Sequence, residues 1–107
     1  MKKFDDSLYL ADMYNDDYFP NFLVDKVKLF ICDVVQYLES GERSIDDIQS
    51  KFDTMTESIN GLHEEFEDNG SEIETGARES TGETVAHILK HFNIDIDVET
   101  AIRNRDW

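Results

Sequence analysis

The first of three periodic apolar segments, residues 23–38, is also the most apolar part of the chain. Its apolar residues follow steps of three and four along one helix face, at positions 23, 27, 30, 31, 34 and 38. Further apolar or aromatic residues widen this face beyond a single stripe: Val24, Leu29, Cys32, Val35 and Tyr37. A helix with so wide an apolar face needs neighbours on more than one side. The pattern predicts a central helix over about residues 20–39, with Pro20 in its first turn.

The second segment alternates three- and four-residue steps through three heptads. Its apolar residues are Ile45, Ile48, Phe52, Met55, Ile59, Leu62 and Phe66. This narrow stripe predicts a helix over about 45–67, packed antiparallel against the central helix after a turn at 40–43. Ser44 and Asp47 resemble a capping box at its start. A coiled-coil dimer through the same heptads is the alternative, but the wide face of the central helix needs this stripe as a cover.

The third segment predicts a helix over about 72–92, with Ser71 and Glu74 as a second capping box. Its middle contains Thr81, Gly82 and Thr84, which are poor helix formers, so we expect either a bend or the close approach of a neighbouring element. Short helices are predicted at both ends of the chain. Ser7 is the candidate cap of the N-terminal one, and Asp97 caps a last helix that begins at Val98.

Together these segments predict an all-α fold, a compact antiparallel bundle of three main helices with short terminal helices. The 107 residues suit a single domain, 1–107, large enough to bury a core without metal or disulfide support. The chain has one cysteine, Cys32, which excludes an internal disulfide and is expected to be a buried, inert thiol.

The charge is strongly acidic: 25 Asp and Glu oppose 10 Lys and Arg, for a net charge of -15. Such a surface repels nucleic acid and anionic lipid, and it speeds encounter with basic partners or simply keeps the protein soluble. Charged residues interrupt the central helix too often for a membrane span. No apolar stretch of signal-peptide type follows the first lysines, so we expect a cytoplasmic protein with neither nucleic-acid nor membrane partners.

The densest acidic run surrounds the predicted turn between the second and third helices. The run comprises Glu64, Glu65, Glu67, Asp68, Glu72, Glu74, Glu79 and Glu83, and we expect these carboxylates to gather at one end of the bundle. The first six of them are the candidate docking surface for a basic protein. A merely solvated face and adventitious binding of divalent cations are the alternatives. The run fits neither an EF-hand loop nor the Glu-x-x-His pattern of a di-iron bundle.

A second candidate surface is the connection before the central helix, where Asp16, Asp17 and Tyr18 precede Phe19 and Pro20. Aromatic side chains bury a large area with little loss of rotamer entropy, and neighbouring carboxylates select a basic partner. We expect Phe19 to pack as a hydrophobic staple, whereas Tyr18 suits either packing or an exposed binding role.

Metal binding and catalysis have little support. His87 and His91 have the i, i+4 spacing of two zinc ligands, with Asp47 as a candidate third ligand. His63 would lie about 18 Å from His87, at about 1.5 Å per residue, and is too far. We expect two surface histidines, no metal and no cofactor. No phosphate-binding glycine loop or nucleophile elbow occurs, so we expect a non-enzymatic protein.

Several segments resemble a bacterial family of short acidic proteins known only as a domain of unknown function. They are residues 13–28, 64–67, 71–75, 77–79 and 105–107. The resemblance covers essentially the whole chain and implies a single cytoplasmic domain of bacterial origin. It implies no activity, ligand or catalytic residue.

The chain is also similar in character to the small acidic helical immunity proteins of nuclease bacteriocins. Those proteins bind a basic toxin domain through carboxylates and a Tyr-Tyr-Pro turn, which residues 17–20 resemble, although here the turn precedes the longest helix. The hypothesis is therefore a non-enzymatic module of immunity or inhibitor type that binds a basic protein, such as a toxin domain, as a monomer or weak homodimer. The alternative is a helical protein that binds a small ligand or metal.

Overall fold

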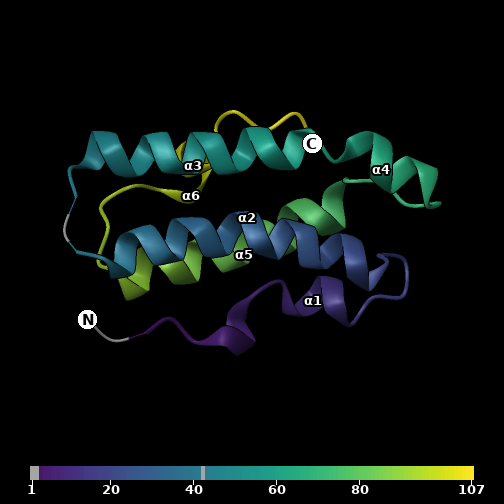
Figure 1. The fold of residues 1–107 in the computed structure, drawn as a ribbon, viewed down its shortest axis with the longest axis horizontal. Helices are drawn as coiled ribbons and strands as arrows, with labels where there is room; N and C mark the ends of the chain where they lie inside the picture. The colour runs from purple at the N-terminus through teal and green to yellow at the C-terminus, as the bar shows by residue number, and fades with distance from the viewer. Residues whose placement is uncertain (1–2, 42) are drawn as a thin grey trace.

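The computed structural model describes residues 3–41 and 43–107, and these residues form helices and connections without any strand (Figure 1). The elements in order are η1 (Asp6–Leu8), α1 (Ala11–Tyr14), α2 (Asn21–Glu39), α3 (Ile45–Asn60), α4 (His63–Asp68), α5 (Thr75–His91) and α6 (Val98–Ala101). The predicted all-α bundle is confirmed. Glu42, in the predicted turn 40–43, lies outside the described residues.

Helix α2 lies at the centre of the core, as its wide apolar face predicts. It buries seven side chains: Leu23, Val24, Val27, Ile31, Val34, Val35 and Leu38. Helix α3 packs antiparallel along α2, whereas α1 contacts both α2 and α5, and α6 contacts α3 and α5 (Figure 1). The buried side chains of all these helices form one continuous hydrophobic cluster. None of the described helices has the length and apolarity that crossing a membrane requires.

The predicted second helix has the correct buried face, but the structure divides it into two helices. Helix α3 ends at Asn60 and α4 begins at His63, because Gly61 weakens the helix and Asn60 bonds elsewhere. The Asn60 side chain donates to the carbonyl of Asn104 at 2.9 Å and accepts from the backbone N–H of Asp106 at 3.2 Å. The heptad residues from Ile48 to Phe66 are nevertheless buried within the chain. These residues therefore cover α2 within one chain, as the wide apolar face of that helix predicts.

The start of the third long helix also differs from the prediction. Helix α5 begins at Thr75, and its N-cap residue Glu74 makes no side-chain capping bond. The predicted second capping box is therefore wrong: the Ser71 side chain is buried instead, at 2% exposure. The first box is half confirmed, since Ser44 Oγ accepts from the backbone N–H of Asp47 at 3.1 Å.

Thr84, in the weak middle of α5, anchors the N-terminal segment. Its Oγ1 accepts from the backbone N–H of Leu10 at 2.9 Å and donates to the carbonyl of Leu8 at 3.1 Å. Leu10 is fully buried with φ of 50°, a left-handed conformation that separates η1 from α1. Of the two expected outcomes, close approach is therefore confirmed. The predicted Ser7 cap is wrong, because Asp5 caps η1 by accepting from the backbone N–H of Ser7.

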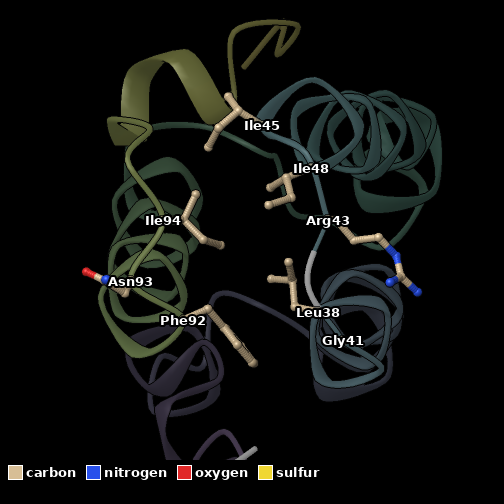
Figure 2. A pocket seen from close by; sticks show the side chains of 8 residues that line it. All are labelled: Leu38, Gly41, Arg43, Ile45, Ile48, Phe92, Asn93 and Ile94. Carbon is tan, nitrogen blue, oxygen red and sulfur yellow. The ribbon is translucent and has the colours of Figure 1, made fainter.

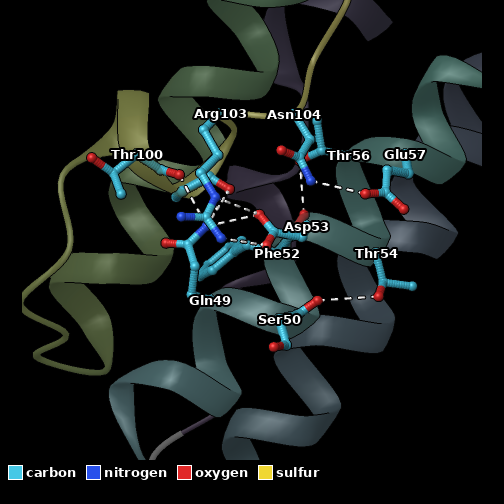
Figure 3. A network of polar contacts seen from close by, with 11 residues as sticks. Gln49, Ser50, Phe52, Asp53, Thr54, Thr56, Glu57, Thr100, Arg103 and Asn104 are labelled. Carbon is cyan, nitrogen blue, oxygen red and sulfur yellow. Dashed lines mark hydrogen bonds and ion pairs between the residues drawn. The ribbon is translucent and has the colours of Figure 1, made fainter.

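The C-terminal segment is bound along α3 by a polar network (Figure 3). The guanidinium of Arg103 donates two hydrogen bonds to the Asp53 carboxylate, one from Nε at 3.2 Å and one from a terminal nitrogen at 2.8 Å. Gln49 donates to the same carboxylate at 3.0 Å and to the Thr100 carbonyl at 2.9 Å. As predicted, Asp97 caps α6 by accepting from the backbone N–H of Thr100.

Removal of the Phe52 ring tests the core. Phe52→Ala is expected to lower the free energy of unfolding by about 3–5 kcal/mol, because it leaves a cavity where the fully buried ring of Phe52 lies in the wild type. Denaturant titration followed by the fluorescence of Trp107, the single and buried tryptophan, measures this loss. The control is Leu29→Ala, which shortens a side chain that is 67% exposed. A change in its free energy of unfolding beyond about 0.5 kcal/mol would contradict the exposed position of Leu29.

The Asp53–Arg103 pair predicts a dependence of stability on pH. Hydrogen bonds from Arg103, and secondarily from Gln49, lower the pKa of Asp53 below its ordinary 3.8. The pair therefore stabilises the fold above that ordinary value, and the stabilisation is lost as the pH falls through the lowered pKa. Arg103→Met is expected to be less stable than wild type at neutral pH, with the difference shrinking in acid. In an Asp53→Asn background the same substitution should show no such dependence on pH.

Candidate functional site

The two predicted acidic surfaces meet at one end of the bundle, where α4, the connection before α2 and the start of α5 converge (Figure 1). Phe19 joins them. Its buried ring contacts the ring of Phe66 edge to face, with centroids 6.5 Å apart. Gly76, at the start of α5, lies against the same ring, since a Cβ at that position would be 3.4 Å from Phe19, an ordinary van der Waals contact. The predicted packing role of Phe19 is confirmed.

We call this region the acidic end, and it contains every predicted partner-binding residue. Its members are Asp16, Asp17, Tyr18, Glu64, Glu65, Glu67, Asp68, Glu72 and Glu74. All of them are exposed except Glu65, which is partly buried and accepts an ion pair from Lys26 of α2. Within residues 3–41 and 43–107, this is the only carboxylate of the acidic end that forms an ion pair. The other carboxylates of the acidic end are exposed, and none of them contacts a cationic side chain of the part of the chain that the structure describes.

Tyr18 connects the two acidic segments. Its ring is 42% exposed and packs edge to face on Phe19 at 5.1 Å, and its backbone N–H donates to Asp16 at 3.0 Å. The hydroxyl lies beside Ser71 and the backbone of Glu72. Loss of hydration, followed by the negative charges of Glu74 and Glu72, raises the pKa of Tyr18 above its ordinary value. Tyr18 therefore both packs on Phe19 and presents part of its side chain to solvent.

This arrangement suits the recognition of cations. Carboxylate oxygens accept hydrogen bonds from lysine and arginine, and the exposed aromatic ring offers a face for a cationic or apolar group. The buried contact of Phe19 with Phe66 packs the connection before α2 against α4. Contacts that are already formed before binding reduce the entropy lost on binding.

Sequence reasoning found the members of the acidic end but treated them as two surfaces. It also missed Lys26, which neutralises Glu65 across the junction of α2 and α4. The two residues are 39 positions apart in the chain, and Glu65 belongs to α4, which the structure separates from α3. The only sequence signal for that break is Gly61 in an otherwise regular heptad pattern.

The alternative metal site is not assembled. Among the described residues, no group of three His, Cys, Asp or Glu side chains is placed to hold a metal ion. His87 lies 3.8 Å from Glu83 on its own helix, and the His91 ring packs edge to face against Phe4 and Phe92. Asp47 therefore does not complete a site with the two histidines.

A groove of about 390 Å³ at the opposite end of the bundle was not predicted (Figure 2). Its lining residues are Leu38, Gly41, Arg43, Ile45, Ile48, Phe92, Asn93 and Ile94. The Arg43 guanidinium points away from the groove, lies over the Tyr37 ring at 4.9 Å and donates to Ser40 Oγ at 2.9 Å. The groove therefore combines apolar side chains with polar surface, and its one charged side chain, Arg43, is not directed at the space where a small ligand would lie.

Comparison with known proteins gives one match. The model of a family of unknown function, DUF5713, matches residues 3–107. No curated protein and no solved structure matches the chain.

Titration of Tyr18 tests the geometry of the acidic end. The pKa of Tyr18 should lie above 10.0 in the wild type and should fall in Glu72→Gln/Glu74→Gln, because the substitutions remove two nearby negative charges. NMR of the ring carbon bonded to the hydroxyl resolves Tyr18 from the other tyrosines, with Tyr18→Phe for assignment. An unchanged pKa would show that the hydroxyl does not face these carboxylates, and Glu83→Gln should leave it unaltered.

Proposed function

Because the chain belongs to DUF5713, a family of unknown function, we propose a function from the geometry of the acidic end. The protein is a non-enzymatic binding module that docks on a basic protein partner. We propose that the module acts as an immunity or inhibitor protein. The proposal also includes a bacterial origin and a cytoplasmic location.

The observation that carries this proposal is the convergence of two acidic segments around an exposed tyrosine. Phe19 packs the connection before α2 on Phe66 of α4, and Tyr18 lies close enough to Glu72 and Glu74 to be affected by their charge. This arrangement supports a common binding role for residues spread along the chain from Asp16 to Glu74. A partly exposed tyrosine on a rigid base is the type of side chain that anchors protein interfaces.

The charge supports a basic partner. With a net charge of -15, the protein attracts basic surfaces over several ångströms and accelerates their encounter. Surfaces that bind nucleic acid are themselves rich in lysine and arginine. An acidic module that covers such a surface would block access to nucleic acid, which is how an inhibitor of a nuclease-type toxin would act.

The second candidate function, small-ligand binding, has one supporting observation. The groove between Leu38, Ile48 and Phe92 has room for a small apolar molecule. Its polar side chains do not converge on that space, whereas the acidic end combines charge, exposure and a rigid base. We therefore favour the protein-binding function.

Capture of proteins from the native host, including the products of adjacent genes, tests the proposal. A stoichiometric complex with a basic protein is expected for the wild type. It should be lost in the charge reversal Glu64→Lys/Glu67→Lys/Glu74→Lys, because repulsion replaces attraction at the interface, and it should be weakened about tenfold or more by Tyr18→Ala. Size-exclusion chromatography and calorimetry measure both effects.

The matched control is Asp46→Lys/Glu83→Lys/Asp95→Lys, which changes the net charge equally at exposed positions outside the acidic end. This variant should retain the complex, since the charge change lies away from the interface. Equal loss of binding in both variants would show that only overall charge matters. Failure to recover any stoichiometric basic partner would contradict the proposal itself.

A further inference from the structure

We propose that the binding surface continues from the acidic end along the solvent-facing side of α2, and that its occupant is a basic amphipathic helix of the partner. This inference rests on the proposed function, which it deepens by naming the anchoring residues and the shape of the ligand. The acidic end supplies charge, and α2 supplies the apolar contacts.

The apolar contacts come from an uneven distribution of exposed large side chains. In the described part of the chain only Tyr18, Phe22, Leu29 and Ile45 belong to this class. Three of these four lie between residues 18 and 29, and Ile45 lies at the opposite end. Phe22 is 49% exposed and Leu29 is 67% exposed. Single exposed apolar residues are ordinary, but a row of them that begins within a charged patch is typical of an interaction site.

Helix geometry places Phe22 and Leu29 on one face. They are seven residues apart, which is about two turns and about 10.5 Å along the axis. Phe22 lies in the first turn of α2, four residues after Tyr18, so the row leads away from the acidic end. A shallow groove of about 90 Å³ lies between α2 and α3. It is lined in part by Phe30, Val34 and Met55, on the side of α2 that faces α3.

The charges around this face favour a basic occupant over a second copy of the chain. Lys26 and Lys51 are engaged by Glu65 and by Asp33, so neither cation offers its full charge to a partner. Exposed Asp25 lies one turn before Leu29, and exposed Asp17 lies beside Tyr18. Two copies would each bring a net charge of -15 to the contact, and the resulting repulsion opposes self-association.

The spacing favours a helix over a strand. Residues seven apart on a partner helix lie about 10.5 Å apart on one face, which matches Phe22 and Leu29. On a strand, side chains of one face recur at about 6.6 Å and about 13 Å, so one of the two anchors would lack an opposing side chain. Lysine or arginine at the flanking positions of such a helix would meet the carboxylates of the acidic end.

A designed peptide provides the test. The probe is a fluorescent lysine–leucine peptide of about 20 residues, long enough to form a helix, with leucine in a seven-residue repeat. Its comparison is a scrambled peptide of identical composition that has no apolar face. Fluorescence anisotropy should show about tenfold or more tighter binding of the amphipathic peptide to the wild type, because only this peptide covers Phe22 and Leu29.

Phe22→Ser/Leu29→Ser should lower the affinity for the amphipathic peptide to that for the scrambled one. The exposed positions allow this variant to fold, which circular dichroism verifies. Ile45→Ser removes an equally exposed apolar side chain elsewhere, 47% exposed, and should bind as the wild type does. Equal binding of the two peptides by the wild type, or undiminished binding by Phe22→Ser/Leu29→Ser, would overturn the inference.

Two further outcomes separate this inference from the proposed function. Glu64→Lys/Glu67→Lys/Glu74→Lys should weaken both peptides. If it weakens neither while Phe22→Ser/Leu29→Ser does, the role of the acidic end fails and the α2 face stands. If light scattering shows a wild-type dimer that Phe22→Ser/Leu29→Ser converts to a monomer, the face is an interface between copies, and the proposed occupant is wrong.

Discussion

The wide apolar face of α2 can leave water only if other elements pack on several sides of it. Burial of a large aliphatic side chain stabilises a fold by about 1.5–3 kcal/mol, and α2 buries seven such side chains along its length. Helix α3 covers one side with its heptad stripe, and the side chains of α1, α5 and α6 complete the same cluster. Even the polar anchors, Thr84 on α5 and Asp53 on α3, serve to hold the terminal segments against this core.

The acidic end depends on that packing. Carboxylates that face one another repel, and a net charge of -15 works against compactness throughout the chain. The buried contact of Phe19 with Phe66 holds the connection before α2 against α4 despite this repulsion. The charged surface is therefore supported by the apolar core beneath it, and a basic partner would relieve the repulsion that the fold sustains.

Charge and apolar area would have different effects in such a complex. Long-range attraction mainly raises the rate of encounter, whereas desolvated aromatic and aliphatic anchors lower the rate of dissociation. The acidic end would supply the long-range attraction, and the exposed side chains of Tyr18, Phe22 and Leu29 would supply the anchors. The groove lined by Leu38 and Phe92 offers apolar area without convergent polar groups, and so has less means of selecting a ligand.

The amino-acid sequence by itself determined the fold class, the three apolar stripes and the membership of both acidic segments. These are local properties: the three- and four-residue periodicity of Ile48 to Phe66 follows from the helical repeat, and the same residues are buried in the structure. Only the tertiary structure decided that α3 ends at Asn60, that Ser71 is buried and not a cap, and that the connection before α2 packs on α4. The reason is that these outcomes depend on contacts between residues far apart in the chain, Asn60 with Asn104 and Phe19 with Phe66, which override local helix and capping preferences.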